Sequence, residues 1–380
     1  MSEETPKNDN RFTDYDGKGI TGLANLGNTC FANALLQCLS HTYELNDFLS
    51  KNDADYKKHL NNKPESVLLV EWDDLRKLMW SQNCVISPGR FINTIQRVAK
   101  ITNRDMFTGW SQNDLPEFLL FLFDSFHNAL TREVIMDIKG NIKTKKDEMG
   151  KSCYEMMKTQ YTKDYSEILN IFFGIHVSVL TPIPVDVNSP NSEDSNYLSI
   201  RPEPYMLINI PIPSKEELNI HKTDKNVTLF DCFDKHCERE ILEGENAWFN
   251  EKANKKQNVS KRLLFWSLPN IMIIDIKRFI TSYSTGKSKK NQQFIDIPIN
   301  NVNFSKYVEG YGKESFIYDL YAICNHHGGI DGGHYSATIK TSNGKWYNFN
   351  DTQVKEIIIT DNIISGNTPY CLFYRKKKIT

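Results

Sequence analysis

The character of the chain changes near residue 165, and this change limits the folds that it can adopt. Before that point, apolar residues recur at helical spacing, and Leu35 and Leu39 after Cys30 predict a helix that begins near this cysteine. After it, runs of β-branched and aromatic residues such as 171–181 predict strands. A mainly helical part followed by a mainly stranded part is the pattern of an α+β fold.

The remaining elements follow from the same patterns. Two more helical segments carry crowded apolar faces, namely Trp72, Leu75 and Met79 on one and Phe118, Leu119, Phe121, Leu122 and Phe126 on the other. Further predicted strands are 207–212, 271–276, 318–324, 334–339, 346–349 and 370–374. Polar composition predicts a long loop at 182–204 and a hairpin or loop at 251–262. Residues 1–17 show no apolar periodicity and are expected to be disordered.

Composition narrows the class of protein. The formal net charge of -1 argues against a nucleic-acid binder, which normally shows a basic excess. No stretch approaches the roughly 20 apolar residues of a membrane span, and the polar N-terminus lacks the apolar core of a secretory signal. We therefore expect an intracellular protein, cytoplasmic, nuclear or both, in which the eight cysteines stay reduced.

Cys30 opens the first predicted helix, where a thiol can become reactive. The unpaired N–H groups and the dipole at a helix N-terminus favour the thiolate over the thiol. Residues 27–29 supply turn and capping chemistry, and Asn25 places an amide donor where it could stabilise an oxyanion. A buried cysteine in a core helix is the alternative interpretation, and we assign Cys38, two turns along, to packing of this kind.

His334 is the candidate base for this thiol. A base must lie beside the nucleophile and be held in one tautomer by a third group. His334 opens a predicted strand, and a turn at 342–344 would bring Asn350 or Asp351 back beside it, to accept the proton on Nδ1. Four glycines near this histidine permit the close backbone approach of a narrow channel, or simply a flexible loop: Gly328, Gly329, Gly332 and Gly333.

Five segments, in this order, resemble the sequence boxes of the ubiquitin-specific proteases. They are 22–33 around Cys30, 112–119, 242–246, 268–279 and 318–354 around His334, and the likeness runs from about residue 19 to 376. The resemblance implies a papain-like cysteine protease with thumb, palm and fingers, which cleaves after the C-terminal Gly-Gly of ubiquitin through a thioester and needs no cofactor. The implied catalytic domain is 18–378, with the thumb at about 18–165, the fingers at about 166–262 and the palm at about 263–378.

The resemblance also implies roles for single residues. Cys30 is the nucleophile and Asn25 the oxyanion donor. His334 is the general base and then the general acid. Asn350 is the third member of the triad, at a position where some members of the family have Asp, and Asp351 beside it is a possible substitute or support.

Contacts with ubiquitin are implied at five positions. His326, Gly332, Gly333 and Tyr335 would line the channel for the C-terminal tail of ubiquitin. Asp114 would face the arginine-rich C-terminal stretch of ubiquitin, where a carboxylate has a charge partner.

The chain departs from the family pattern in its fingers. Many members bind zinc there with two Cys-x-x-Cys pairs, but the matching stretches, 176–182 and 248–252, hold no cysteine. Cys232 and Cys237 lie in a different, predicted helical segment. Because tetrahedral zinc needs four ligands, we expect no metal. Pro116 also replaces a polar residue that is common in the family.

Two other functions stay open at this point. The chain could be a non-catalytic ubiquitin-binding scaffold, since loss of the zinc pairs suggests drift. It could also be a protease for a ubiquitin-like modifier such as SUMO or NEDD8, because the same channel would serve either. The expected partners are ubiquitin or ubiquitinated proteins, with no nucleic acid and no membrane, and an activating protein partner is not identified by the sequence.

Overall fold

The first part of the chain folds into the predicted helices. The structure, a computed structural model, describes residues 10–51, 55–183, 197–281, 286–329 and 332–378. Its helices up to residue 130 are α1 (Cys30–Ser40), α2 (Tyr43–Lys51), α3 (Asp55–Lys58), α4 (Glu65–Ser81), α5 (Gly89–Ile101) and α6 (Leu115–Leu130). The two predicted apolar faces belong to α4 and α6, which pack together and stack Trp72 on Phe126. Helix α1 begins at Cys30, as predicted, and all its residues are buried.

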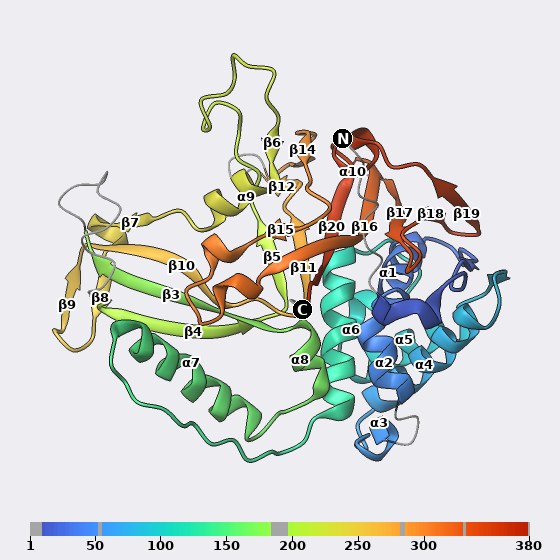
Figure 1. The fold of residues 1–380 in the computed structure, drawn as a ribbon, viewed down its shortest axis with the longest axis horizontal. Helices are drawn as coiled ribbons and strands as arrows, with labels where there is room; N and C mark the ends of the chain where they lie inside the picture. Colours follow the sequence, from blue (N-terminus) through green and yellow to red (C-terminus); the bar gives the residue numbers. More distant parts are fainter. Residues whose placement is uncertain (1–9, 52–54, 184–196, 282–285, 330–331, 379–380) are drawn as a thin grey trace.

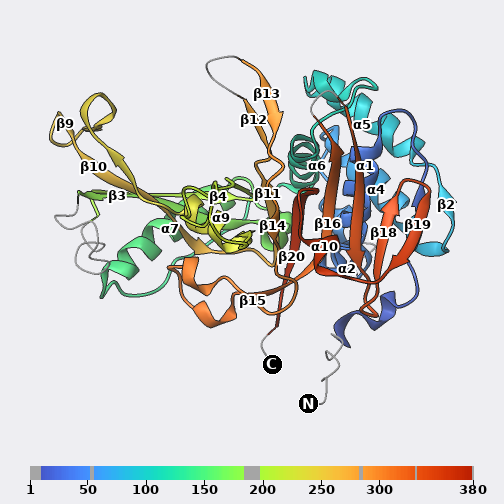
Figure 2. The ribbon, with the colours of Figure 1, turned by 90° about the horizontal axis from the view of Figure 1, so that it is seen from above.

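The central sheet runs in the order β19-β18-β17-β16-β20-β11-β5, with β15 paired to β16. Its strands are β5 (Leu207–Ile210), β11 (Ile271–Ile276), β15 (Val302–Asn303), β16 (Ile317–Gly328), β17 (Gly333–Lys340), β18 (Trp346–Asn350), β19 (Gln353–Ile357) and β20 (Pro369–Lys376). Helix α1 lies against β16, β17 and β18, and one apolar core joins this face of the sheet to the helices. Figure 2 shows α1 beside β16 of the central sheet, and the contacts of α1 with β17 place the helix that begins at Cys30 next to the strand that carries His334.

A second sheet extends away from the helices, as Figures 1 and 2 show. It has the order β4-β3-β10-β7, with β3 (Gly174–Pro182), β4 (Ser199–Tyr205), β7 (Glu240–Leu242) and β10 (Val259–Ser267). Helix α7 (Lys145–Tyr161) packs along β4, and its Met149 and Cys153 share a small apolar core with Val177 and Trp266. This core therefore holds the extended sheet to α7.

Shorter elements complete the described fold. They are α8 (Glu167–Phe172), α9 (Leu229–His236), α10 (Asp361–Ile364), β1 (Gly22–Leu23), β2 (Val85–Ile86), β6 (Val227–Thr228), β8 (Trp248–Asn250), β9 (Lys255–Gln257), β12 (Phe279–Thr281), β13 (Ser288–Lys290) and β14 (Ile295–Asp296). Strands β8 and β9 pair at the far end of the second sheet, and β12 pairs with β13.

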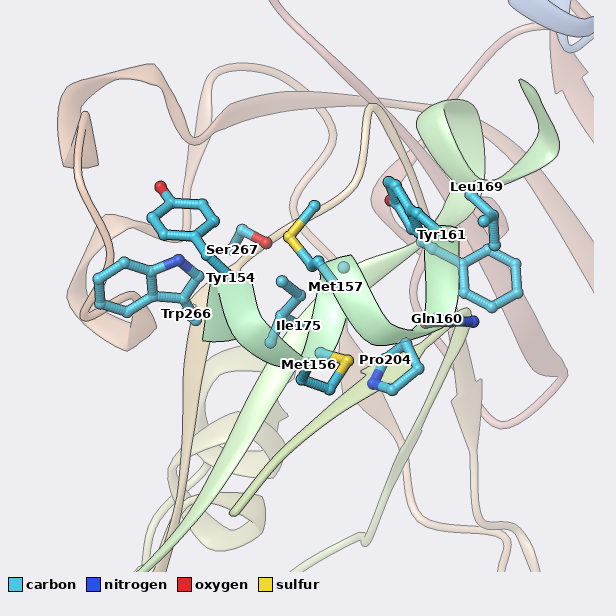
Figure 3. A pocket seen from close by; sticks show the side chains of 12 residues that line it. Tyr154, Met156, Met157, Gln160, Tyr161, Leu169, Ile175, Pro204, Trp266 and Ser267 are labelled. Carbon is cyan, nitrogen blue, oxygen red and sulfur yellow. The ribbon is translucent and has the colours of Figure 1, made fainter. Parts of the chain in front are cut away.

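A cavity of about 180 Å³ lies at the root of the second sheet, beside α7 and α8 (Figure 3). Its lining is Tyr154, Met156, Met157, Gln160, Tyr161, Leu169, Phe173, Gly174, Ile175, Pro204, Trp266 and Ser267. None of these residues belongs to the site that the sequence predicts, so this cavity is separate from the expected chemistry.

The expectation of a disordered N-terminal tail is wrong for its last residues. Residues 10–15 form 3-10 turns, and Phe12 is only 6% exposed, with its ring 4.8 Å from that of Tyr43. Tyr15 stacks on Tyr43 at 4.4 Å and donates a hydrogen bond to Asp47 at 2.8 Å. Two aromatic anchors are too few to produce a periodic signal, which explains the error. Residues 1–9 lie outside the described part of the chain.

Two boundaries of the predicted loops and strands also need correction, and a third region is confirmed. The predicted loop 182–204 ends in strand β4, which tolerates its two prolines because it is the edge of its sheet; residues 184–196 are outside the described part. The hairpin or loop predicted at 251–262 is the β8–β9 hairpin, followed by the start of β10. The predicted strand 171–181 begins only at Gly174, because its first two residues finish α8.

Candidate active site

Cys30 is the first residue of α1 and is 3% exposed. Backbone N–H groups of Phe31 and Tyr335 approach its sulfur and favour the thiolate, but burial has the larger effect and raises the Cys30 pKa. The carboxylate of Asp351 acts in the same direction as burial. In the arrangement seen here Cys30 is therefore a protonated thiol at neutral pH.

His334 and Asn350 meet across the β17–β18 hairpin, whose turn lies at the predicted residues. Nε2 of His334 lies 2.6 Å from Oδ1 of Asn350, so the ring donates from Nε2 to the amide oxygen. The expectation that Nδ1 would make this contact is wrong. Because Nε2 of His334 points toward Asn350 at the end of β18, Nδ1 is the ring nitrogen that could accept a proton from a thiol.

Cys30 and His334 are close in the fold but are not paired. Within the described residues, no hydrogen bond joins the sulfur of Cys30 to the imidazole of His334, and the backbone of Tyr335, the next residue along β17, lowers the Cys30 pKa. Catalytic hydrogen bonds often form only in the complex with substrate. The absence of this hydrogen bond here does not exclude His334 as the base.

Asp351 contacts two asparagines rather than His334. Its Oδ2 accepts from Nδ2 of Asn25 at 3.0 Å, and its Oδ1 accepts from Nδ2 of Asn33 at 2.7 Å. Asp351 reaches both because it adopts a left-handed backbone, with φ of 51°, at the turn after β18. It therefore positions the predicted oxyanion donor, Asn25, and does not orient the base.

Asn25 is fixed from its other side as well. Its Oδ1 accepts the N–H groups of Gly27 and Thr29 at 3.0 and 3.2 Å, which holds the loop before α1. One N–H of its amide goes to Asp351, and within the described part of the chain no group accepts the second. That second N–H is the one available to an oxyanion.

Asn33 is a site residue that the sequence interpretation missed. It lies one turn along α1 from Cys30, is 2% exposed, and its amide also approaches the carbonyl oxygens of Leu23 and Ala24 at 3.4 and 3.3 Å. The sequence did offer one signal, because Asn33 is a polar residue on a helix that is predicted to be buried in the core.

His326 lies in an aromatic surround on β16. Its ring centroid is 4.7 Å from that of Tyr335, 5.2 Å from Phe279 and 6.0 Å from Tyr370. Burial, together with the nearby Lys290 ammonium, lowers the His326 pKa to about 4, so the ring is neutral at physiological pH. Its backbone carbonyl accepts from Nζ of Lys290 at 2.6 Å.

The glycines beside His334 differ in what they require. A Cβ on Gly333 would collide with the ring of His326 and lie 2.7 Å from the carbonyl oxygen of His327, so only glycine fits there. Gly332 faces open space and is exposed. Nε2 of Gln112 donates to the carbonyl of Gly333 at 3.2 Å, which links the segment before α6 to the start of β17.

Asp114 directly precedes α6 and accepts a hydrogen bond from the Tyr370 hydroxyl at 2.8 Å. Burial of its carboxyl group raises the Asp114 pKa, although the residue as a whole is exposed. Pro116, the departure from the family pattern, is buried in the first turn of α6, where a missing N–H costs no hydrogen bond. The substitution therefore leaves the position of Asp114 intact.

Neither a metal-binding cluster nor a membrane-spanning helix is found in the part of the chain that the structure describes. Over the described ranges, no group of three or more His, Cys, Asp or Glu residues could hold a metal ion. Cys232 and Cys237 are both buried at α9, on the predicted helix. None of the helices that the structure describes has the length and apolar character to cross a membrane.

Curated proteins match almost the whole chain. It is 30% identical over 364 residues to the human ubiquitin carboxyl-terminal hydrolase 2, a match that covers 94% of this chain and 55% of the relative. It is 29% identical over 375 residues to the bovine ubiquitin carboxyl-terminal hydrolase 21, covering 94% of this chain and 62% of the relative. The chain thus spans a little over half the length of these relatives.

Solved structures match the fold. The chain has a TM-score of 0.68 to a SAGA DUB module of Ubp8, Sgf11, Sus1 and Sgf73 bound to monoubiquitin, and of 0.65 to the module bound to ubiquitin aldehyde. In both cases identity is 22%, with coverage of 96% of this chain and 70% of the other. At this identity the likeness concerns the fold alone, and it confirms the predicted α+β, papain-like fold.

The family match covers every predicted catalytic residue. The sequence model described as "Ubiquitin carboxyl-terminal hydrolase" matches residues 21–374, from the strand before Cys30 to the last strand of the central sheet. With a family match over this length, together with the relatives and the fold, the chain belongs to the ubiquitin carboxyl-terminal hydrolase family.

Proposed function

We propose that this chain is a deubiquitinating thiol protease, which hydrolyses the isopeptide or peptide bond after the C-terminal Gly-Gly of ubiquitin. The observation that carries the proposal is a cysteine at a helix N-terminus, next to a strand whose His334 is held by Asn350 at 2.6 Å. The relatives named above are ubiquitin carboxyl-terminal hydrolases, and the similar DUB module was solved with ubiquitin and with ubiquitin aldehyde.

The first half of the reaction forms a thioester. Nδ1 of His334 takes the proton from Cys30, and the thiolate attacks the carbonyl carbon of the last glycine of ubiquitin. The oxyanion that forms accepts hydrogen bonds from the free N–H of Asn25 and from the backbone N–H at the start of α1. The imidazolium then gives its proton to the leaving lysine amine, and the C–N bond breaks.

The second half releases ubiquitin. His334, now neutral, takes a proton from water while the water oxygen attacks the thioester carbon. The C–S bond breaks, ubiquitin leaves with a free carboxylate, and the thiolate of Cys30 recovers a proton. Asn350 keeps Nε2 of His334 protonated throughout, so Nδ1 is the nitrogen that carries each proton.

The binding of the tail and the subdomains are proposed on the same basis. We assign His326, Gly332, Gly333 and Tyr335 to the channel for the tail, with Asp114 as the contact for an arginine of the tail. The thumb, fingers and palm correspond to about 18–165, 166–262 and 263–378.

The test is reaction with ubiquitin that carries a thiol-reactive group at its C-terminus. We expect the mass to increase by one ubiquitin, and peptide mapping to place the adduct on Cys30 and on none of the other seven cysteines (8 − 1). Matched SUMO and NEDD8 probes should not react. Tight ubiquitin binding without an adduct would support a scaffold instead, and reaction with a SUMO or NEDD8 probe alone would overturn the ubiquitin assignment.

Asp351→Ala tests the proposed oxyanion site. Because Asp351 fixes the amide of Asn25, its loss is expected to lower kcat for a fluorogenic ubiquitin conjugate by roughly 100-fold with little change in KM. Asn25→Ala should cost a similar factor, and the double variant should be little worse than either single one. Additive losses would show that the two residues act independently, contrary to the proposed positioning.

The surroundings in which the protein works are also proposed. All eight cysteines are free thiols, including Cys38 and Cys324, whose sulfurs lie 3.4 Å apart without a bond. This supports the expectation of a reducing, intracellular setting, cytoplasmic or nuclear. The proposed partners are ubiquitin and ubiquitinated proteins.

A further inference from the structure

Asp275 is a buried carboxyl group outside the catalytic set. It lies near the end of β11, opposite Cys371 of β20, and is 8% exposed. Its Oδ1 is fully enclosed, and within the described part of the chain no group donates a hydrogen bond to it. A buried carboxylate without donors is costly, so such a group normally takes up a proton or pairs with a cation.

Asp275 points to the side of the sheet where the proposed tail channel lies. Alternation along β11 puts it on the same face as Ile271 and Ile273, which belong to the core shared with the helices. Asp114, at the start of α6, is close enough for its charge to raise the Asp275 pKa. Tyr370, next to Cys371 along β20, donates a hydrogen bond to Asp114, and burial together with the charges of Asp114 and Asp275 raises the pKa of its hydroxyl.

These carboxyl groups form a series from the surface inward. Glu117, exposed in the first turn of α6, raises the pKa of Asp114, and Asp114 in turn raises that of Asp275. Burial is the larger cause for Asp275 and brings its pKa to about 7. Asp275, the most buried of these three carboxyl groups, thus makes no ion pair within the described part of the free protein.

Lys277 is a nearby cation that could pair with Asp275 in place of a ligand. Its charge lowers the Asp275 pKa, but the residue is exposed, and it makes no ion pair with Asp275 among the contacts of the described residues. Within the described residues Asp275 therefore has no ion-pair partner.

We propose that Asp275 is a specificity residue that binds the guanidinium of an arginine in the ubiquitin tail, from a more buried position than the contact assigned to Asp114. The inference rests on the proposed function, since it is the ubiquitin tail that brings the arginine. Guanidinium matches a carboxylate in charge and in planar geometry, and pairing would offset the cost of burying the Asp275 charge. Charge along Glu117 and Asp114 would guide the cation inward.

The test is the affinity of wild-type and Asp275→Asn protein for free ubiquitin, measured by calorimetry. Loss of a charge-assisted contact is expected to weaken Kd about tenfold. The same substitution should have no effect with a ubiquitin variant in which the responsible tail arginine is replaced by alanine; each tail arginine is tested in turn. Asp124→Asn, which removes an exposed charge from α6, is the control of equal net charge.

The outcomes separate this inference from the proposed function. An equal loss of affinity with every ubiquitin variant, or no loss at all, would overturn the assignment of Asp275. Affinity is measured apart from cleavage, so a protein that shows the coupling but does not cleave ubiquitin would retain the assignment and refute the protease. No binding of ubiquitin at all would overturn both.

Thermal unfolding gives a second readout of the unpaired carboxyl. The folded state keeps its proton up to about pH 7, whereas the unfolded chain releases it near the ordinary value of 3.8, so wild-type stability falls as pH rises between these values. Asp275→Asn lacks this loss, and its Tm should exceed that of the wild type by an amount that grows from pH 4 to pH 8. A constant difference would show that the carboxyl has a partner in the free protein, which would overturn the proposal.

Discussion

Cys30→Ala is expected to lower kcat/KM for a ubiquitin conjugate by roughly 10⁴-fold or more, because no thioester can form without the nucleophile. Ubiquitin binding should stay within about threefold of the wild type, since removal of one sulfur deletes no contact assigned to the tail. The measurement is the rate of release of a fluorophore from the ubiquitin C-terminus, with affinity for free ubiquitin determined in parallel.

The structure supplies the control for this variant. Cys84 is partly exposed and lies on none of the elements of the site, so Cys84→Ala should retain wild-type rates. Alanine at position 30 preserves the start of α1, because it is a strong helix former and the residue fits the same buried space. Retained cleavage in Cys30→Ala would refute the thiol mechanism whatever the state of the other cysteines.

The raised Cys30 pKa has a consequence in the free protein. Because burial favours the thiol, the rate of alkylation of Cys30 by iodoacetamide should still be rising at pH 9, the ordinary pKa of the group. Only an approach of Nδ1 of His334 to the sulfur would bring the thiolate into the neutral range. A plateau below pH 8 without ubiquitin would mean that the pair is already formed.

The strongest sequence signals predicted the frame of the site. Helix α1 starts at Cys30 because the apolar spacing behind that residue demands a buried helix, and the β17–β18 hairpin forms because its turn residues permit it. The hairpin brings Asn350 beside His334, whereas only the resemblance to the family joined Cys30 to this pair.

The contacts that tune the site could not be predicted in this way. Asp351 binds Asn25 and Asn33, two residues more than 300 positions away along the chain, through a left-handed turn that no periodicity reveals. The choice of Nε2 over Nδ1 depends on the direction of a ring on β17. In the sequence, Asp275 is a single polar residue within an apolar strand. Its interaction with Asp114 becomes visible only in the folded chain.

His334→Ala is expected to lower kcat/KM by roughly 10³-fold to 10⁴-fold at neutral pH. The variant lacks both the base that ionises Cys30 and the acid that protonates the leaving amine, and proton transfer of this kind contributes about 10² to 10⁴. Asn350→Ala should cost less, because the imidazole remains and loses only the partner that fixes its tautomer.

The pH dependence distinguishes a missing base from a damaged fold. Without His334 the thiolate forms only by ionisation of a buried thiol, so the residual rate of His334→Ala should increase with pH through 9 and beyond. His327, which faces His334 across β16 and β17 and is exposed, provides the matched control, and His327→Ala should retain the wild-type profile. If His334→Ala kept the wild-type pH profile at a uniformly lower rate, the histidine would serve the structure and another group would be the base.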